Sequence, residues 1–167
     1  MTPLSDLMAE YRRQLERGIV QEAYRGLMAY LSSLRSHIEA RHPNCAVSGS
    51  LYLGTMDMTY FSVTPRSLAD RRLKVAVVFL HEAFRFEVWL AGANKQVQAA
   101  FWKRFRASGW DRYRVVPATR GVDAIVEHVL ADPPDFRDLD ALTERVERGT
   151  FAFIADVEEF LSGHGAG

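Results

Sequence analysis

The sequence predicts an α+β fold: an antiparallel sheet of four to five strands, from two consecutive β-hairpins, flanked by an N-terminal αα-hairpin and C-terminal helices. Apolar residues recur at helical spacing up to residue 41, alternate with polar residues from 46 to 91, and return to helical spacing afterwards. Hydrophobic residues make up 48% and charged residues 25% of the 167 positions, which is a globular composition. We therefore expect one domain over residues 1–162 and a frayed tail at 163–167.

Two helices are expected at the start of the chain. Ser5 or Asp6 can cap the first helix, and Gly18 ends it. The second helix spans residues 19–41 and stops before Pro43. Together they predict an αα-hairpin. The apolar residues expected to face the core are Leu7, Met8, Tyr11 and Leu15 in the first helix and Tyr24, Leu27, Leu31, Leu34 and Ile38 in the second.

Two hairpins follow. Residues 46–53 and 56–63 alternate around a turn at residues 54–55, and residues 73–80 and 84–91 form the second pair. A turn near Glu82 would place Phe79 opposite Phe86 and Val77 opposite Val88. This register collects large apolar side chains on one face of the hairpin and leaves a more polar opposite face.

The rest of the chain is predicted to be mostly helical. A helix is expected at 93–108, a short fifth strand at 112–116, and a helix carrying Val122, Ile125, Val126 and Val129. Two further helices are expected to start at Asp138 and Thr150, separated by Gly149.

Charge and cysteine content restrict the cellular setting. The 21 basic and 21 acidic residues cancel, so the whole chain has no net attraction for nucleic acid or an anionic membrane. The single cysteine, Cys45, excludes an internal disulfide and fits a reducing compartment. Neither a signal peptide nor a membrane-spanning run is recognisable. We expect a cytoplasmic protein with no membrane partner.

The first candidate site is the polar face of the second hairpin. Arg85, Glu87 and Trp89 alternate along one strand, with Lys74 on its neighbour. A cation, a carboxylate and a flat aromatic wall can bind a polar or anionic ligand. The alternative is an ordinary exposed sheet face with a weak surface ion pair.

The second candidate site is the start of the helix after Gly92. Asn94, Gln98 and Trp102 lie four residues apart, on a helix face distinct from the apolar stripe. Backbone donors at such a helix start can hold an anion. The alternative is that Asn94 caps the helix and Gln98 is solvated. We combine both groups into one predicted ligand cleft, in a binding or interaction module without a cofactor or a metal.

Two other functions remain open at this point. A metal-dependent hydrolase would use Glu87 or Asp57, although no complete metal motif is present. Nucleic-acid binding would use the basic and aromatic segment 95–120, although acidic residues after 122 can neutralise that segment within the fold. The sequence leaves open whether the protein is an enzyme.

Several strings in the chain are informative together. They are Ser48-Gly-Ser-Leu-Tyr-Leu-Gly, Met56-Asp-Met-Thr-Tyr-Phe, Phe84-Arg-Phe-Glu-Val-Trp-Leu-Ala-Gly and Asn94-Lys-Gln-Val-Gln. With them the chain resembles, over nearly its whole length, a family of small bacterial proteins known only as a domain of unknown function. The resemblance implies a bacterial cytosolic origin and a single domain, and it brings no activity or site residues.

Overall fold

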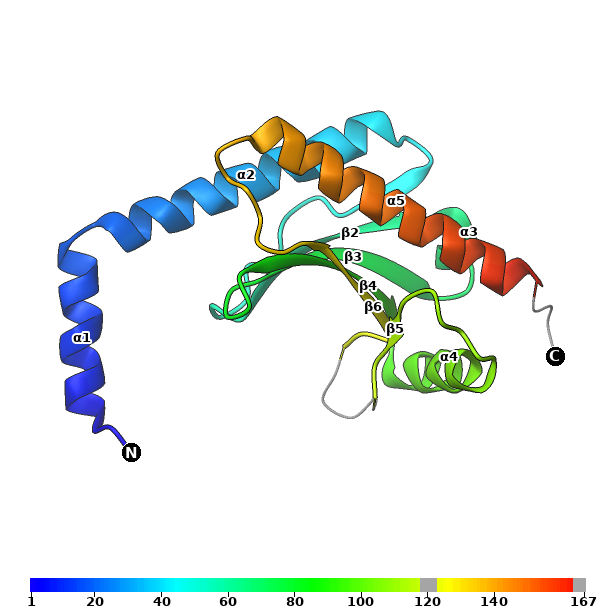
Figure 1. Ribbon diagram of the computed structural model, residues 1–167, viewed down its shortest axis with the longest axis horizontal. Coiled ribbons are helices and arrows are strands. Elements are labelled where there is room, and N and C mark those ends of the chain that lie inside the picture. The colour runs from blue at the N-terminus through cyan, green and yellow to red at the C-terminus, as the bar shows by residue number, and fades with distance from the viewer. Residues whose placement is uncertain (118–122, 164–167) are drawn as a thin grey trace.

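A computed structural model describes residues 1–117 and 123–163 (Figure 1). The helices are α1 (Leu4–Glu16), α2 (Ile19–Arg41), α3 (Arg66–Ala69), α4 (Lys95–Ala107) and α5 (Leu139–Gly163). The strands are β1 (Cys45–Val47), β2 (Met58–Pro65), β3 (Leu73–Leu80), β4 (Arg85–Gly92), β5 (Arg114–Val115) and β6 (Val126–Ala131). They form one antiparallel sheet in the order β1-β2-β3-β4-β6-β5. The predicted α+β class is confirmed, with six strands in the described residues rather than four or five.

Helices α2 and α5 cover one face of the sheet, and α4 lies on the other side (Figure 1). The covered face is the apolar face predicted for the second hairpin. Helix α2 has the predicted bounds, and its stripe is buried from Leu31 onward. The largest fully buried side chains of the core include Leu31, Leu34, Ile38, Phe61, Phe79, Phe86, Leu90, Phe153 and Leu161.

The register of the second hairpin is confirmed. Phe79 pairs with Phe86 and Val77 with Val88, and the connection is the longer loop 81–84. The first hairpin is also antiparallel, but its first strand is short. Only Cys45–Val47 pairs regularly with β2, and the chain returns to β2 once more at the Tyr52–Tyr60 bridge. The irregular segment between them leaves one side of β2 partly free.

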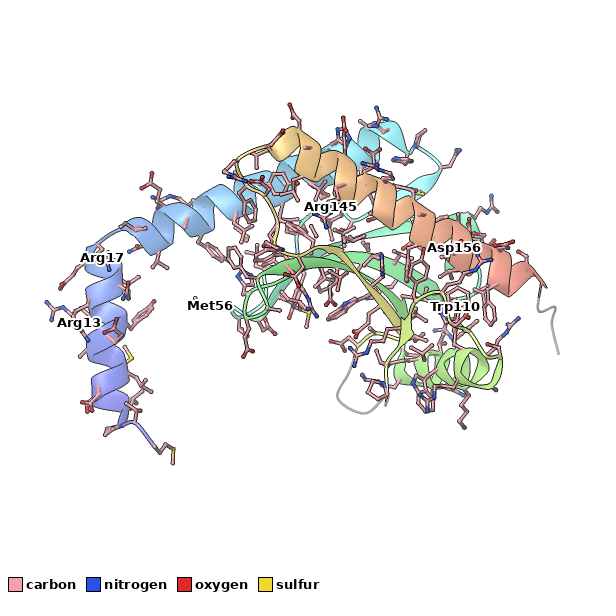
Figure 2. The ribbon with its side chains drawn as sticks, viewed as in Figure 1. Arg13, Arg17, Met56, Trp110, Arg145 and Asp156 are labelled. Atoms are coloured by element: carbon pink, nitrogen blue, oxygen red, sulfur yellow. The ribbon has the colours of Figure 1, made fainter. Side chains whose placement is uncertain are left out.

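The predicted N-terminal helices follow one another, but α1 does not fold back along α2. Gly18 adopts a left-handed conformation with φ 72°, and α1 points away from the rest of the protein in Figure 1. None of its residues is buried, so Leu7, Met8 and Tyr11 do not join the core as expected. Figure 2 shows its side chains standing clear of the sheet, with Arg13 on the outer side.

The prediction of a helix around residues 122–129 is wrong. Val126–Ala131 is strand β6, which pairs with β4 from Phe86 to Leu90. Without β6, the hydrogen-bonding edge of β4 would be open. The β-branched residues of β6 fit a strand at least as well as a helix. Val122 lies outside the described residues.

The two predicted C-terminal helices are one helix, α5, which continues through Gly149. A Cβ atom at Gly149 would lie 2.6 Å from Leu130 Cδ2. Glycine therefore allows α5 to approach β6 closely, and burial of the helix face outweighs the weak helix propensity of this residue. Helix α5 ends at Gly163, and residues 164–167 of the predicted tail lie outside the described part of the chain.

A charged cluster joins the end of α2 to α5. Glu147 Oε1 accepts hydrogen bonds from Arg41 Nε at 2.9 Å and lies 2.7 Å from His42 Nε2, and Glu147 Oε2 lies 2.8 Å from His37 Nε2. Burial raises the pKa of Glu147, but the hydrogen bonds from His37, His42 and Arg41 outweigh it and hold the pKa at about 2, below the ordinary 4.5. The cluster therefore stabilises the folded state only while Glu147 is ionised.

We expect Glu147→Gln to lower the free energy of unfolding by about 1.5–3 kcal/mol near neutral pH, because three hydrogen bonds to a charged acceptor are weakened. A carboxylate with a depressed folded-state pKa contributes its full stability above the unfolded value. The difference between wild type and Glu147→Gln should therefore shrink as the pH falls from 4.5 toward about 2. Urea unfolding across this pH range measures it.

Glu144→Gln is the matched control, since Glu144 is exposed on the same helix. It should change the free energy of unfolding by less than about 0.5 kcal/mol. A Glu147→Gln penalty that stayed constant on acidification would contradict the role of this cluster.

Candidate functional site

The sheet face opposite α2 and α5 carries polar and aromatic side chains. Ala76 pairs with Trp89 and Val78 with Glu87, so these residues share one face with Lys74 at alternate positions. Tyr60 joins the same face, because it pairs with Val78 from the other side. Helix α4 begins at one end of this face, immediately after β4.

A cavity of about 320 Å³ lies between this face and the start of α4. Its floor comes from β2, β3 and β4, and its wall from the β4–α4 connection. The lining residues are Tyr52, Met58, Tyr60, Lys74, Ala76, Val78, Trp89, Ala91, Gly92, Ala93, Asn94, Lys95, Gln98 and Asp123. The volume is at the lower end of the range for small-molecule sites.

Aromatic rings dominate one side of this cavity. Tyr52 and Tyr60 stack with ring centroids 4.8 Å apart and planes 26° apart. The isolated bridge between their backbones holds them side by side. Burial raises the pKa of Tyr60, and the nearby Tyr52 and Asp123 raise it further, so its hydroxyl remains a neutral donor at physiological pH.

Trp89 is oriented by Glu87. The Trp89 indole Nε1 donates to Glu87 Oε2 at 2.6 Å, and Arg85 Nε donates to Glu87 Oε1 at 2.8 Å. Glu87 is 2% exposed, so both of its oxygens are occupied inside the protein. Within this arrangement Glu87 positions the indole ring and is not itself accessible to a ligand.

A second, smaller cavity of about 180 Å³ lies on the same sheet face, and Arg85 and Glu87 are among its lining residues. Its other residues include Arg114 and Glu127, which form an ion pair. Burial raises the pKa of Glu127, and the neighbouring Glu87 raises it further, while Arg114 and Arg85 oppose the change. The charged side chains that line this second cavity are therefore paired with each other, Arg85 with Glu87 and Arg114 with Glu127.

The junction between β4 and α4 is tightly packed. A Cβ atom at Gly92 would lie 2.5 Å from the backbone nitrogen of Gln98 and 3.1 Å from the carbonyl oxygen of Asn94. Only glycine allows the first turn of α4 to approach the end of β4 this closely. The Asn94 side chain accepts a hydrogen bond from Val97 N at 2.9 Å and thus caps α4, as the simpler interpretation of that residue predicted.

The predicted site residues do not all line one cavity. Trp89, Asn94 and Gln98 line the larger cavity, whereas Arg85 and Glu87 line the smaller one. Both cavities lie on the same sheet face, and the Glu87–Trp89 hydrogen bond joins a lining residue of one to a lining residue of the other. Gln98 is 3% exposed, so it is part of the packed wall rather than solvated.

Trp102 lines neither of these two cavities. Its Nε1 donates to the carbonyl oxygen of Val116 at 2.7 Å, and Arg106 lies 5.4 Å above its ring. Trp102 lies one full turn of α4 beyond Gln98. Its indole is therefore farther from the cavity and contacts the segment after the helix.

Tyr52, Tyr60 and Asp123 line the larger cavity but are not among the site residues that the sequence predicts. The two tyrosines reach the cavity because β2 pairs with β3, which places the first hairpin beside the second. Alternation within one hairpin shows which residues share a face but not which other hairpin lies next to it. Asp123 lies after a long connection, and its Oδ1 lies 3.7 Å from Lys95 Nζ.

The hydrolase alternative draws no support from the arrangement of its residues. Asp57 Oδ1 accepts a hydrogen bond from Thr55 N at 2.9 Å, and such backbone hydrogen bonds lower the pKa of Asp57. It is a turn residue at the start of β2. Among residues 1–117 and 123–163, no three histidine, cysteine, aspartate or glutamate side chains are grouped so that they could hold a metal ion.

Basic residues of the segment 95–120 contact acidic residues elsewhere in the fold. Arg112 Nη1 lies 2.7 Å from both Asp156 Oδ1 and Glu159 Oε2 on α5. The Tyr113 hydroxyl donates to Asp156 at 2.5 Å, and burial together with this carboxylate raises the pKa of Tyr113 to about 12. Figure 2 places Trp110 beside the C-terminal half of α5, near Asp156. This pairing agrees with neutralisation within the fold.

The chain belongs to the family described as a domain of unknown function, DUF7000, which matches residues 4–161. No curated protein and no solved structure matches the chain. In the described parts of the chain, no helix combines the length and apolar character that crossing a bilayer requires.

Gly92→Ala should destabilise the protein by about 1–3 kcal/mol, because the added methyl group meets backbone atoms of α4 that cannot move independently. Gly49→Ala is the matched control, since a Cβ atom at exposed Gly49 meets nothing within 4 Å. Thermal unfolding of the two variants compares them. Equal stabilities would contradict the close approach of β4 and α4.

Proposed function

We propose that the protein binds a small molecule that carries a flat ring and an anionic group in the larger cavity. The observation that carries this proposal is the convergence of Tyr52, Tyr60, Trp89 and Lys74 on one hollow of about 320 Å³. Small-molecule sites combine apolar and aromatic walls with a few fixed polar groups, and this cavity has that composition.

The aromatic side chains favour a planar ligand group. Trp89 is held by a buried carboxylate, and Tyr60 is half-buried beside its stacked partner Tyr52. Rings that are already fixed lose little side-chain entropy when a ligand stacks on them. Ala76 and Ala91 add little volume to the floor, so the space above them remains free for a ring.

Lys74 favours an anionic substituent. Its side chain is exposed at the cavity rim, and it forms no ion pair with another described residue closer than 4 Å. The start of α4 lines the same cavity through Asn94, Lys95 and Gln98, and it carries the positive end of the helix dipole. Lys95, by contrast, is paired with Asp123, so Lys74 is the better candidate for contact with the ligand.

Binding accounts for these groups more simply than catalysis does. The most deeply buried acid on this face, Glu87, already accepts hydrogen bonds from Arg85 and Trp89. It therefore supports the wall of the site. The single Cys45 and the balanced charge lead us to place this binding module in the cytosol.

A fragment screen by NMR, on protein labelled with nitrogen-15, tests the proposal. Fragments should be supplied in three matched groups: flat aromatic acids, the same rings without the acid, and aliphatic acids of similar size. We expect the aromatic acids to bind best and to shift backbone amide signals around Lys74, Ala91 and Gln98. Their binding should raise the melting temperature, by about 2–4 °C for each kcal/mol gained.

Lys74→Ala should weaken the aromatic acids at least tenfold, which corresponds to about 1.4 kcal/mol, and leave the neutral rings nearly unaffected. Lys103→Ala is the control, since Lys103 is an exposed lysine on α4 outside the cavity lining. Fragment signals that cluster away from the cavity, or equal losses with both lysine variants, would contradict the proposal.

A further inference from the structure

Helix α1 presents an apolar stripe that no described residue of its own chain buries. Leu4, Leu7, Met8 and Tyr11 are 71%, 53%, 51% and 53% exposed, and they recur at the spacing that places them on one helix face. Arg13 lies on the opposite face of the helix by the same spacing. Because Arg13 lies on the outer side in Figure 2, the stripe is turned toward the space between α1 and the sheet.

An apolar groove of about 500 Å³ opens on that same space. One wall is the first half of α2, with Val20, Tyr24 and Leu27, and the other wall is made by Phe84 and Leu139. Both Phe84, at 55%, and Leu139, at 45%, remain well exposed. Met56 lies at a loop tip on this side of the sheet in Figure 2 and adds to the rim.

The stripe and the groove form one surface through the Gly18 junction. Ile19 and Val20 follow directly after Gly18 and are 59% and 41% exposed. Ten of the thirteen exposed large hydrophobic residues in the described chain belong to α1, its flanks and the groove rim. Together they expose on the order of 900 Å² of side chain, above the roughly 300–600 Å² of the largest patch on a typical monomer.

We propose that a second copy of this chain covers this surface, with α1 of each copy lying in the groove of the other. Each chain supplies both an unpartnered amphipathic helix and an apolar groove that could receive such a helix. Exchange of α1 between two copies satisfies both at once and closes under twofold symmetry. The area also agrees, since a stable interface buries roughly 800 Å² from each partner.

The geometry of α1 fits this exchange. A helix of 13 residues is about 20 Å long, enough to run along the exposed half of α2. Its attachment to α2 passes through Arg17 and Gly18 alone, and Gly18 holds the left-handed conformation that directs α1 outward. None of the α1 side chains is buried in its own chain, so α1 is available to a partner without disturbing the core.

Sedimentation of the full-length protein over a dilution series tests the proposal. We expect a dimer that dissociates on dilution, and Tyr11→Glu should raise the dissociation constant at least tenfold. Leu139→Glu, on the groove side, should do the same. Arg13→Ala is the control on the outer face of α1 and should leave the dissociation constant nearly unchanged. Circular dichroism would check that each variant remains folded.

Mixing the two variants separates exchange of α1 from other dimers. A mixed dimer of Tyr11→Glu and Leu139→Glu chains keeps one intact α1–groove contact, whereas each variant alone has both contacts damaged. The mixture should therefore form dimers at concentrations where neither variant does. A wild-type protein that sediments as a monomer at its highest soluble concentration would overturn the proposal. Failure of the mixture to restore dimers would overturn it too.

Discussion

Pairing of β3 with β4 is the constraint on which the other features of the structure depend. Residues on a strand alternate between two faces, so the register that joins Phe79 to Phe86 also joins Val78 to Glu87. A slip of β4 by one residue against β3 would bury Arg85 against α2 and α5 and expose Phe86 on the opposite face. The same pairing therefore creates the core on one side and the cavity floor on the other. Helix α4 and strand β6 then dock on edges and faces that this hairpin has already defined.

The buried Glu87 illustrates how such a face is maintained. An unpaired carboxylate in this position would be costly, because removal of a charge from water is compensated only by well-oriented partners. Arg85 and Trp89 provide those partners from the same strand, each two residues away. The site therefore owes the orientation of its largest ring to a contact that is local in sequence. The tyrosine pair, by contrast, depends on contacts between different hairpins.

This difference between local and distant contacts explains how much could be predicted from the sequence. The bounds of α2, the hairpin register and the shared face of Lys74, Glu87 and Trp89 follow from periodicity, which is a local property. Strand β6 was predicted as a helix, because valine and isoleucine at positions 125, 126 and 129 satisfy both periods over so short a segment. Its state is decided by the free edge of β4. Continuity of α5 through Gly149 is likewise decided by Leu130, which lies on another element.

The hydrogen bond between Trp89 and Glu87 gives the cavity a built-in optical reporter. Indole fluorescence responds to nearby charge and to changes in solvent access, and Trp89 lies against both a carboxylate and the hollow. The other two tryptophans pack elsewhere: Trp102 donates to the carbonyl oxygen of Val116, and Trp110 packs between Phe105 and Phe160. Because neither lines the larger cavity, their fluorescence should change little when a ligand enters it. The state of the cavity can therefore be followed by light in the unlabelled protein, even before the identity of any ligand is known.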